Sequence, residues 1–165
     1  MLNIREANLS DLESIFYIMK SNDILKNIFG DLSKKEILDK IKQRLTDKKW
    51  KIFVAIKDNK VIGYTCFCSL KDYAEERFLP EGINSKRYVI SCGLAVYSKY
   101  HRQGIASELK KYVFEKVSKE YKGIYAAVLE NNFISIKLQN SLGLVMKQKY
   151  VCPSGKNYCL FLKEF

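Results

Sequence analysis

The stretch from Tyr88 to Leu129 constrains the fold more than any other part of the chain. It reads as an apolar run, YVISCGLAVYSKY, then HRQGIAS with its glycine, then an amphipathic run, then a second apolar run, IYAAVL. This order predicts strand, turn, helix and strand, and a connection of that length makes the two strands parallel with a right-handed crossover. The sequence therefore predicts a βαβ unit at the centre of a fold of the α/β class.

The helical run has one apolar face and one charged face. Its apolar residues recur at spacings of three and four: Ile105, Leu109, Tyr112, Val113 and Val117. Its charged residues are expected mostly on the opposite face: Lys110, Lys111, Glu115 and Lys116. This pattern is typical of a helix that packs one side against a sheet.

The turn before this helix is a candidate anion site. Gly104 lets the backbone come close to a ligand, and the N–H groups of Gln103 to Ser107 lie at the helix N-terminus. Unpaired N–H groups and the positive end of the helix dipole favour phosphate oxygens. The structural alternative is that the turn only connects strand and helix.

Two motifs resemble those of a known family. The segment LAVYSKYHRQGIAS, from Leu94 to Ser107, resembles the pyrophosphate-binding motif of the GNAT superfamily of N-acetyltransferases, whose pattern is Gln/Arg-x-x-Gly-x-Gly/Ala. His101 stands at the Gln/Arg position, Gly104 at the glycine and Ala106 at the last small residue.

The second motif follows at Glu130 to Val145 and is similar to the family's Asn-x-x-Ala…Leu-Tyr-x-x-x-Gly-Phe segment. Asn132, Leu138 and Gly143 match it, whereas Ser135, Gln139 and Leu144 replace the family's Ala, Tyr and Phe. Two motifs in this order, joined by a predicted helix and strand, are more specific than either alone. With the N-terminal IREANLSDLESI also in family style, the resemblance covers nearly the whole chain.

The resemblance implies a GNAT-like fold with a mixed (α+β) sheet of about seven strands and about four helices, in one domain over residues 1–165. Further strands are expected at Leu2–Glu6, Trp50–Ile56, Val61–Leu70, Leu144–Val151 and Tyr158–Phe165. Asp58-Asn59 is a turn signal that predicts an antiparallel hairpin between the second and third of these. Further helices are expected after a cap at Asn8 or Ser10, after the capping box of Ser33 and Glu36, and over Asn132–Ser141. The first two of these helices resemble the part of the family fold that walls the acceptor side.

The resemblance also implies acetyl-CoA as the co-substrate and a set of residues that bind it. These cofactor-binding residues are Leu94, Ala95, Val96, His101, Arg102, Gln103, Gly104, Ile105, Ala106, Ser107 and Asn132. The backbone N–H groups of Leu94 to Val96 are expected to hold the thioester, with Leu94 as the oxyanion donor. Asn132 matches a residue that contacts the pantetheine arm, and it is also a good helix N-cap.

The residues that transfer protons are the part of the reaction for which the sequence gives the least information. A free alkylamine has a pKa near 10.4, so only about one molecule in 10³ is reactive at neutral pH without a base or a desolvating site. Glu130 is the candidate base, and the acids of the loop from Asp72 to Glu81 are further candidates. Gln139 has no labile proton, which leaves Tyr97, Tyr100, Tyr150, Tyr158 or water as the general acid.

That acidic loop lies within Lys71–Lys86, and the pattern leaves two interpretations open. It could attract a cationic amine, or it could be a short solvated helix followed by a loop. Both interpretations stay open at this point.

Composition excludes several other classes of protein. The net charge of +11 favours anionic partners, but the cations are dispersed and lack clustered Arg with interleaved aromatics, which disfavours nucleic acid. An odd number of cysteines, five, without an export signal indicates reduced thiols, and Cys66 and Cys68 are interpreted as small buried residues rather than metal ligands. We expect no metal site and no membrane segment, and hence a cytoplasmic protein.

The sequence thus predicts an acetyl-CoA-dependent N-acetyltransferase, an acyltransferase that acts by direct transfer in a ternary complex. The acceptor is expected to be the primary amine of a small molecule or a peptide, and a homodimer is left open. The first alternative is a non-catalytic acyl-CoA-binding module, suggested by Gln139. The second is a basic nucleic-acid-binding protein.

Overall fold

A mixed sheet carries the fold. The structure, a computed structural model, describes residues 2–24, 29–76, 83 and 87–165. Among these residues seven strands are hydrogen-bonded in the order β1-β2-β3-β4-β5-β7-β6. Strand β4 (Tyr88–Val96) and strand β5 (Gly123–Leu129) are parallel, with Tyr88 opposite Gly123 and Ser91 opposite Ala126, whereas the pairs β1·β2, β5·β7 and β6·β7 are antiparallel. The predicted mixed sheet with one βαβ unit at its centre is therefore confirmed.

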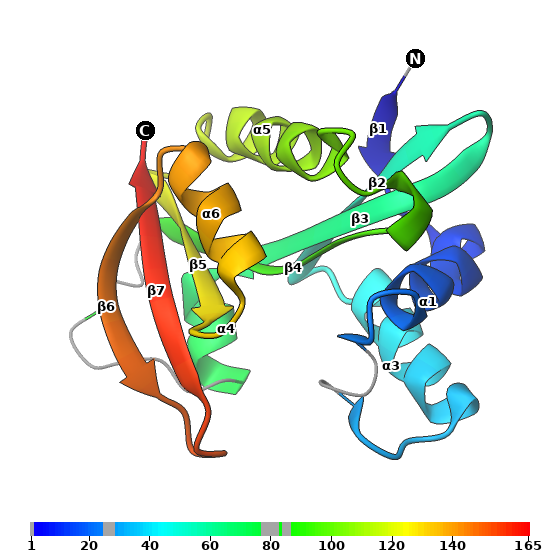
Figure 1. The fold of residues 1–165 in the computed structure, drawn as a ribbon, viewed down its shortest axis with the longest axis horizontal. Helices are drawn as coiled ribbons and strands as arrows, with labels where there is room; N and C mark the ends of the chain where they lie inside the picture. The colour runs from blue at the N-terminus through cyan, green and yellow to red at the C-terminus, as the bar shows by residue number, and fades with distance from the viewer. Residues whose placement is uncertain (1, 25–28, 77–82, 84–86) are drawn as a thin grey trace. The chain divides into compact units, whose positions relative to one another are not determined.

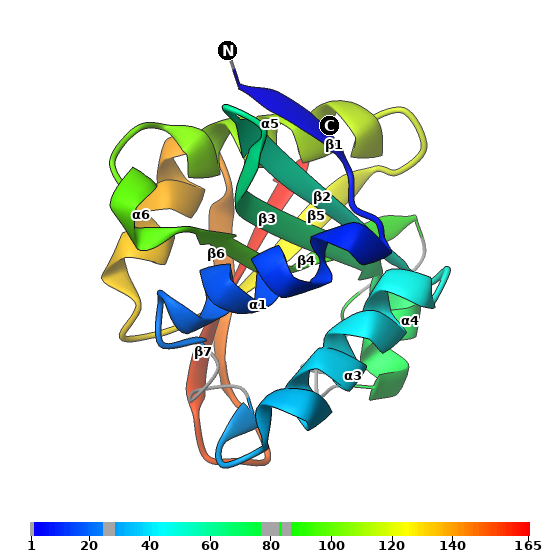
Figure 2. The same ribbon diagram turned by 90° about the vertical axis from the view of Figure 1, so that its right-hand side faces the viewer.

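The chain divides into two compact units, Met1–Cys66 with Gly93–Lys110 and Phe67–Cys92 with Lys111–Phe165. The first contains β1 (Asn3–Glu6), the 3₁₀ turn η1 (Leu9–Asp11), α1 (Leu12–Lys20), α3 (Lys34–Thr46), β2 (Trp50–Lys57) and most of β3 (Lys60–Ser69). Figure 2 shows β1 beside β2 and the helices α1 and α3 of this unit. Asp58 and Asn59, with φ of 49° and 57°, make the tight β2–β3 hairpin that their sequence predicts.

Helices pack on both faces of the first unit's strands. The start of α5 (Ile105–Val117) buries Ile105 and Leu109 against Ala55 and Val96. Because successive residues of a strand point to opposite faces, the even-numbered residues of β2, Trp50 among them, face away from α5. Helix α3 packs on that other face, since its Arg44 lies over the Trp50 ring.

The second unit is built around β7 (Asn157–Glu164), which lies between β5 and β6 (Val145–Val151), as Figure 1 shows. Helix α6 (Phe133–Ser141) follows β5 and begins at the expected cap, because the Asn132 side chain accepts a hydrogen bond of 3.1 Å from the Ser135 N–H. The capping box of Ser33 and Glu36 is also confirmed at α3.

Two details differ from the predictions. The described residues contain five α-helices rather than about four, because α4 (Leu70–Glu76) forms, in agreement with the short-helix interpretation of Lys71–Lys86; Glu81 lies outside the described residues. Lys110, expected on the charged face of α5, is 1% exposed. It precedes the buried Phe114 by four residues and Val117 by seven, which places it on their side of the helix.

Cys66 and Cys68 are buried as predicted. None of the helices in the part of the chain that the structure describes is long and apolar enough to cross a membrane.

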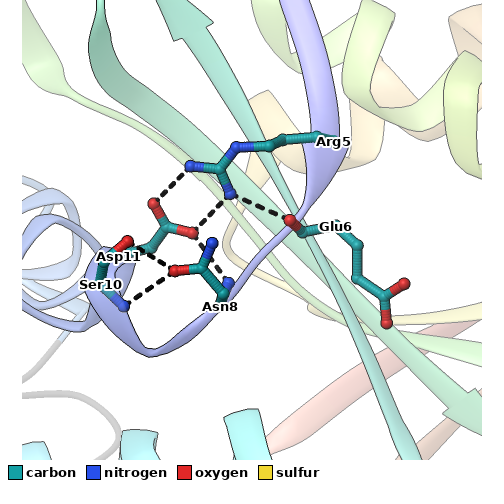
Figure 3. Close-up of polar contacts among 5 residues, drawn as sticks. All are labelled: Arg5, Glu6, Asn8, Ser10 and Asp11. Carbon is teal, nitrogen blue, oxygen red and sulfur yellow. Dashed lines mark hydrogen bonds and ion pairs between the residues drawn. The ribbon is translucent and has the colours of Figure 1, made fainter.

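A buried carboxylate fixes the path from β1 into α1 (Figure 3). Arg5 donates to both oxygens of Asp11, at 2.7 and 2.9 Å, and the Asn8 N–H donates to Asp11 at 2.9 Å. The Asn8 side chain in turn accepts from the Ser10 N–H, so Asn8 and Asp11 form a capping box. Burial alone raises the pKa of Asp11, but the hydrogen bonds from Arg5 and Asn8 outweigh it and hold that pKa below its usual value.

Replacing this carboxylate tests its contribution to stability. We expect Asp11→Asn to lower the free energy of unfolding by about 2 kcal/mol, because the Arg5 guanidinium loses its charged partner at a buried position. A group whose pKa is lowered by folding stabilises above its unfolded pKa, near 3.9, so the loss is full at neutral pH and shrinks as the pH falls below about 4. Urea unfolding at several pH values measures this.

The matched control is Glu13→Gln, which removes an exposed acid two residues along the chain. It is expected to change stability by less than about 1 kcal/mol. A loss at Asp11→Asn that is equally large at pH 3 and pH 7 would contradict the charge-based account.

Candidate functional site

In the part of the chain that the structure describes, the register of β4 with β5 ends at Ser91, so the last residues of β4 extend beyond it. The parallel register with β5 joins Tyr88–Ser91 to Gly123–Ala126, and the whole of β5, Gly123–Leu129, pairs with β7. The Tyr97 N–H donates to Ile62 at 2.7 Å and the Gly93 carbonyl accepts from Thr65 Oγ1, so these odd-numbered residues face β3. Since the backbone groups of successive strand residues alternate between the two edges, we infer that the N–H groups of Leu94 and Val96 face the opposite edge.

The last carbonyl of β4 is held by two side chains. The Val96 oxygen accepts from Asn22 Nδ2 at 2.8 Å and from His101 Nε2 at 2.9 Å. Because a carbonyl can only accept, this contact requires the proton on Nε2 of His101. His101, which departs from the resembled motif, therefore closes the loop back onto the strand that precedes it.

The glycine turn joins β4 to α5 (Figure 1). Arg102 and Gly104 both have positive φ, at 61° and 77°. A Cβ placed on Gly104 would meet no atom within 4 Å, so its outer side is open. The first helical hydrogen bond runs from the Glu108 N–H to the Gly104 oxygen, and the N–H groups of Ile105 to Ser107 precede it. These N–H groups can donate hydrogen bonds to an anion, which is the role that the sequence predicts for them.

Cations surround the same turn. Lys57 Nζ, at the end of β2, donates to Gln103 Oε1 at 3.3 Å and lies 5.8 Å from the centre of the Tyr100 ring. Lys99 Nζ lies 5.1 Å from the ring centres of both Tyr97 and Tyr100. With Arg102 on the surface, these side chains make the turn electropositive and suit it to a phosphate.

Glu130 and Asn132 belong to the second unit. Glu130 makes an exposed ion pair with Lys149, which raises the pKa of Lys149. Asn132 uses its side-chain oxygen to cap α6. Tyr150 and Tyr158 stack in this unit with ring centres 5.6 Å apart, and burial raises the pKa of Tyr150 to about 12.

Gln139 is the least expected side chain of the second unit. It is 3% exposed, and its Oε1 accepts no hydrogen bond from any group that the structure describes. A buried acceptor without a donor costs about 1–3 kcal/mol. This oxygen is therefore a polar atom that a bound ligand or water could satisfy.

Sequence reasoning brings together the residues from Leu94 to Ser107, and the structure places them in one unit. It missed Asn22 and Lys57. Asn22 lies 74 residues before Val96, and no local pattern marks such a contact. Lys57 is marked only by the hairpin turn at Asp58 and Asn59, which fixes where β2 ends but not what its last side chain touches.

Comparison with known proteins gives a family. The sequence model of the acetyltransferase (GNAT) family matches residues 15–144. No curated protein matches the sequence.

Solved structures share the fold. An N-acetyltransferase from Staphylococcus aureus is similar with a TM-score of 0.76 and 17% identity, over 99% of this chain and 98% of that chain. For a ribosomal-protein-alanine N-acetyltransferase from Brucella melitensis the values are 0.72 and 20%, over 99% of both chains. For Arabidopsis thaliana NAA60 in complex with acetyl-CoA they are 0.69 and 18%, over 100% and 99%. At these identities the likeness confirms a GNAT-like fold.

The unpaired oxygen of Gln139 can be tested by stability. Met has a similar shape and no acceptor, so Gln139→Met is expected to raise the free energy of unfolding by about 1 kcal/mol and the melting temperature by roughly 2–4 °C. Gln43→Met, at an exposed position of α3, is the control and is expected to change little. A clear loss of stability in Gln139→Met alone would contradict this account.

Proposed function

Because this chain belongs to the acetyltransferase (GNAT) family, we propose that it is an N-acetyltransferase that transfers the acetyl group of acetyl-CoA to a primary amine. The transfer is direct, in a ternary complex, and residues 1–165 act as one acetyltransferase domain. The observation that supports it most is the pairing of two features on one segment. Leu94 and Val96 lie on β4 beyond its register with β5 as far as the described residues go, and an open, electropositive glycine turn at Gly104 follows them.

The turn fits the anionic part of acetyl-CoA. The N–H groups of Ile105, Ala106 and Ser107 suit a pyrophosphate, and Gly104 presents no side chain to block it. Lys57, Lys99 and Arg102 supply positive charge at the same place. Support also comes from NAA60, whose structure has this fold and contains acetyl-CoA.

Acetyl-CoA supplies an activated acetyl group as a thioester. The Leu94 N–H is the proposed donor to the thioester oxygen as negative charge develops on it, and the loss of one such donor typically costs about 3 kcal/mol. The Val96 N–H, on the same edge, is proposed to help hold the thioester in place. Asn22 and His101 keep this edge in place because they bind the Val96 carbonyl. In this step a C–N bond forms, the C–S bond breaks, and the ammonium proton leaves.

Glu130 is the proposed acceptor of that proton, directly or through water, and the thiolate takes a proton from water or a tyrosine. Asn132 is proposed to contact the pantetheine arm in addition to capping α6. Glu130→Gln tests the proton step. If Glu130 is the base, the pH profile of kcat/KM loses its acidic limb, whereas an unchanged profile at unchanged stability would remove Glu130 from the mechanism.

The glycine turn offers a matched pair of variants. Gly104→Val is expected to weaken acetyl-CoA binding by at least tenfold in isothermal titration calorimetry, because the side chain enters the space proposed for the pyrophosphate. Gly155→Val is the control, since Gly155 has nearly the same φ of 78° and equally open surroundings, so both variants bear the same backbone strain of roughly 1–2 kcal/mol. Equal acetyl-CoA affinity in the two folded variants would rule out the assigned site.

Turnover separates the proposed function from its rivals. The enzyme is expected to release CoA and acetylated product with at least one amine of a broad panel. Binding of acetyl-CoA at high affinity with no product across the panel would favour a non-catalytic acyl-CoA-binding module. Steeply salt-dependent binding of RNA or DNA, with no acetyl-CoA binding, would favour a nucleic-acid-binding protein.

A further inference from the structure

A guanidinium lies over an indole on the face of the first unit that points away from α5. Arg44, in the last turn of α3, places its Cζ 4.8 Å from the centre of the Trp50 ring. Trp50 is 7% exposed, so its ring is held in place by packing, whereas Arg44 is half-buried. An Arg stacked in this way keeps its N–H donors at the rim of the plane, where they can bind a planar anion.

Tyr64 lies on the same face of the first unit and comes close to β4. A Cβ on Gly63 would meet Leu109 and Val96, which are on the α5 side, so the neighbouring Tyr64 projects to the other face. There its ring and hydroxyl lie 3.6 and 3.8 Å from the position of a Cβ on Gly93. Gly93 directly precedes Leu94, the proposed oxyanion donor.

The charges around Tyr64 agree with this placement. Burial is the main effect, and it raises the pKa of Tyr64 far above its usual value; Cys66 adds to the rise and the Arg44 charge opposes it. Tyr64 therefore stays protonated and can donate its hydroxyl proton in a hydrogen bond at any physiological pH.

Arg44 differs from three cations of this unit that form ion pairs. Arg5 binds Asp11, Lys34 binds Glu13 and Lys51 binds Glu6. Among the side chains that the structure describes, no carboxylate pairs with Arg44. A half-buried guanidinium that lacks a counter-ion is poised to take one from a ligand.

We propose that Arg44, stacked on Trp50 on the same face of the first unit as Tyr64, binds a carboxylate of the acceptor, so that the acceptor is an amino carboxylate rather than a simple alkylamine. The inference rests on the proposed function, and it names the substrate class of the same site. The carboxylate at Arg44 positions the amine near Leu94 on β4.

Paired acceptors test this directly. Each amino carboxylate is compared with its own amide: glycine, β-alanine and 4-aminobutyrate for free acceptors, and alanyl-glutamate amide against alanyl-glutamine amide for a peptide source. We expect kcat/KM to favour the carboxylate at least tenfold in one pair, mainly through KM. A preference in one of the free amino carboxylates indicates a free acceptor, and a preference in the dipeptide pair indicates a peptide acceptor.

Arg44→Gln is expected to abolish that preference and to leave the KM for acetyl-CoA unchanged, while Arg44→Lys retains part of it because the charge remains. Lys42→Gln, on the same helix and exposed, removes one charge at a distance and is expected to retain the full preference. Amides used as well as carboxylates by the wild-type enzyme, or a preference that survives in Arg44→Gln, would overturn the proposal.

A binding measurement keeps the two proposals distinguishable. The same carboxylates and amides are titrated into the protein with CoA present, and binding is followed by ¹⁵N-resolved NMR. Selective carboxylate binding that Arg44→Gln removes supports the site even if no acceptor is turned over, in which case the proposed function alone has failed. No carboxylate binding to the wild-type protein, together with acetylation of the amides, would mean that Arg44 only packs against Trp50.

Discussion

The capped carbonyl of Val96 is the contact on which the site depends. A strand that ends beside an unfilled edge tends to twist or fray, because its backbone groups lack partners. Here Asn22 and His101 bind the Val96 oxygen, and the Tyr97 N–H is bound by Ile62. These contacts fix the strand end, and they do so without occupying the N–H groups that face the same edge.

The two faces of the first unit differ in where their cations lie and in how far those cations are buried. On the α5 side, the cations at the glycine turn surround amides that can bind phosphate. On the α3 side, Arg44 and Trp50 form the only described cation–aromatic stack that places a guanidinium on an indole. Between them, β4 carries Gly93 and Leu94. A Cβ at Gly93 would lie in tight contact with Cys66 Sγ, at 3.1 Å.

Local sequence patterns predicted the elements whose structure depends on neighbouring residues. The βαβ unit, the hairpin at Asp58 and Asn59 and the caps at Ser33 and Asn132 follow from periodicity and from side-chain capping, so the structure confirms them. The Asn22 contact could not be predicted, because it joins positions 74 residues apart. Lys110 and Gln139 were missed because burial of a polar side chain is decided by tertiary packing, which sequence pattern does not encode.

The most direct measurement is a titration of the ¹⁵N-labelled protein with acetyl-CoA, because it reports on the backbone N–H groups that side-chain substitution cannot remove. The account predicts large, saturable shifts for the amides of Leu94, Val96 and Ile105 to Ser107, with smaller shifts in β1 and β2. Binding that leaves these amides unmoved and shifts another surface would contradict it, as would no shift at millimolar acetyl-CoA.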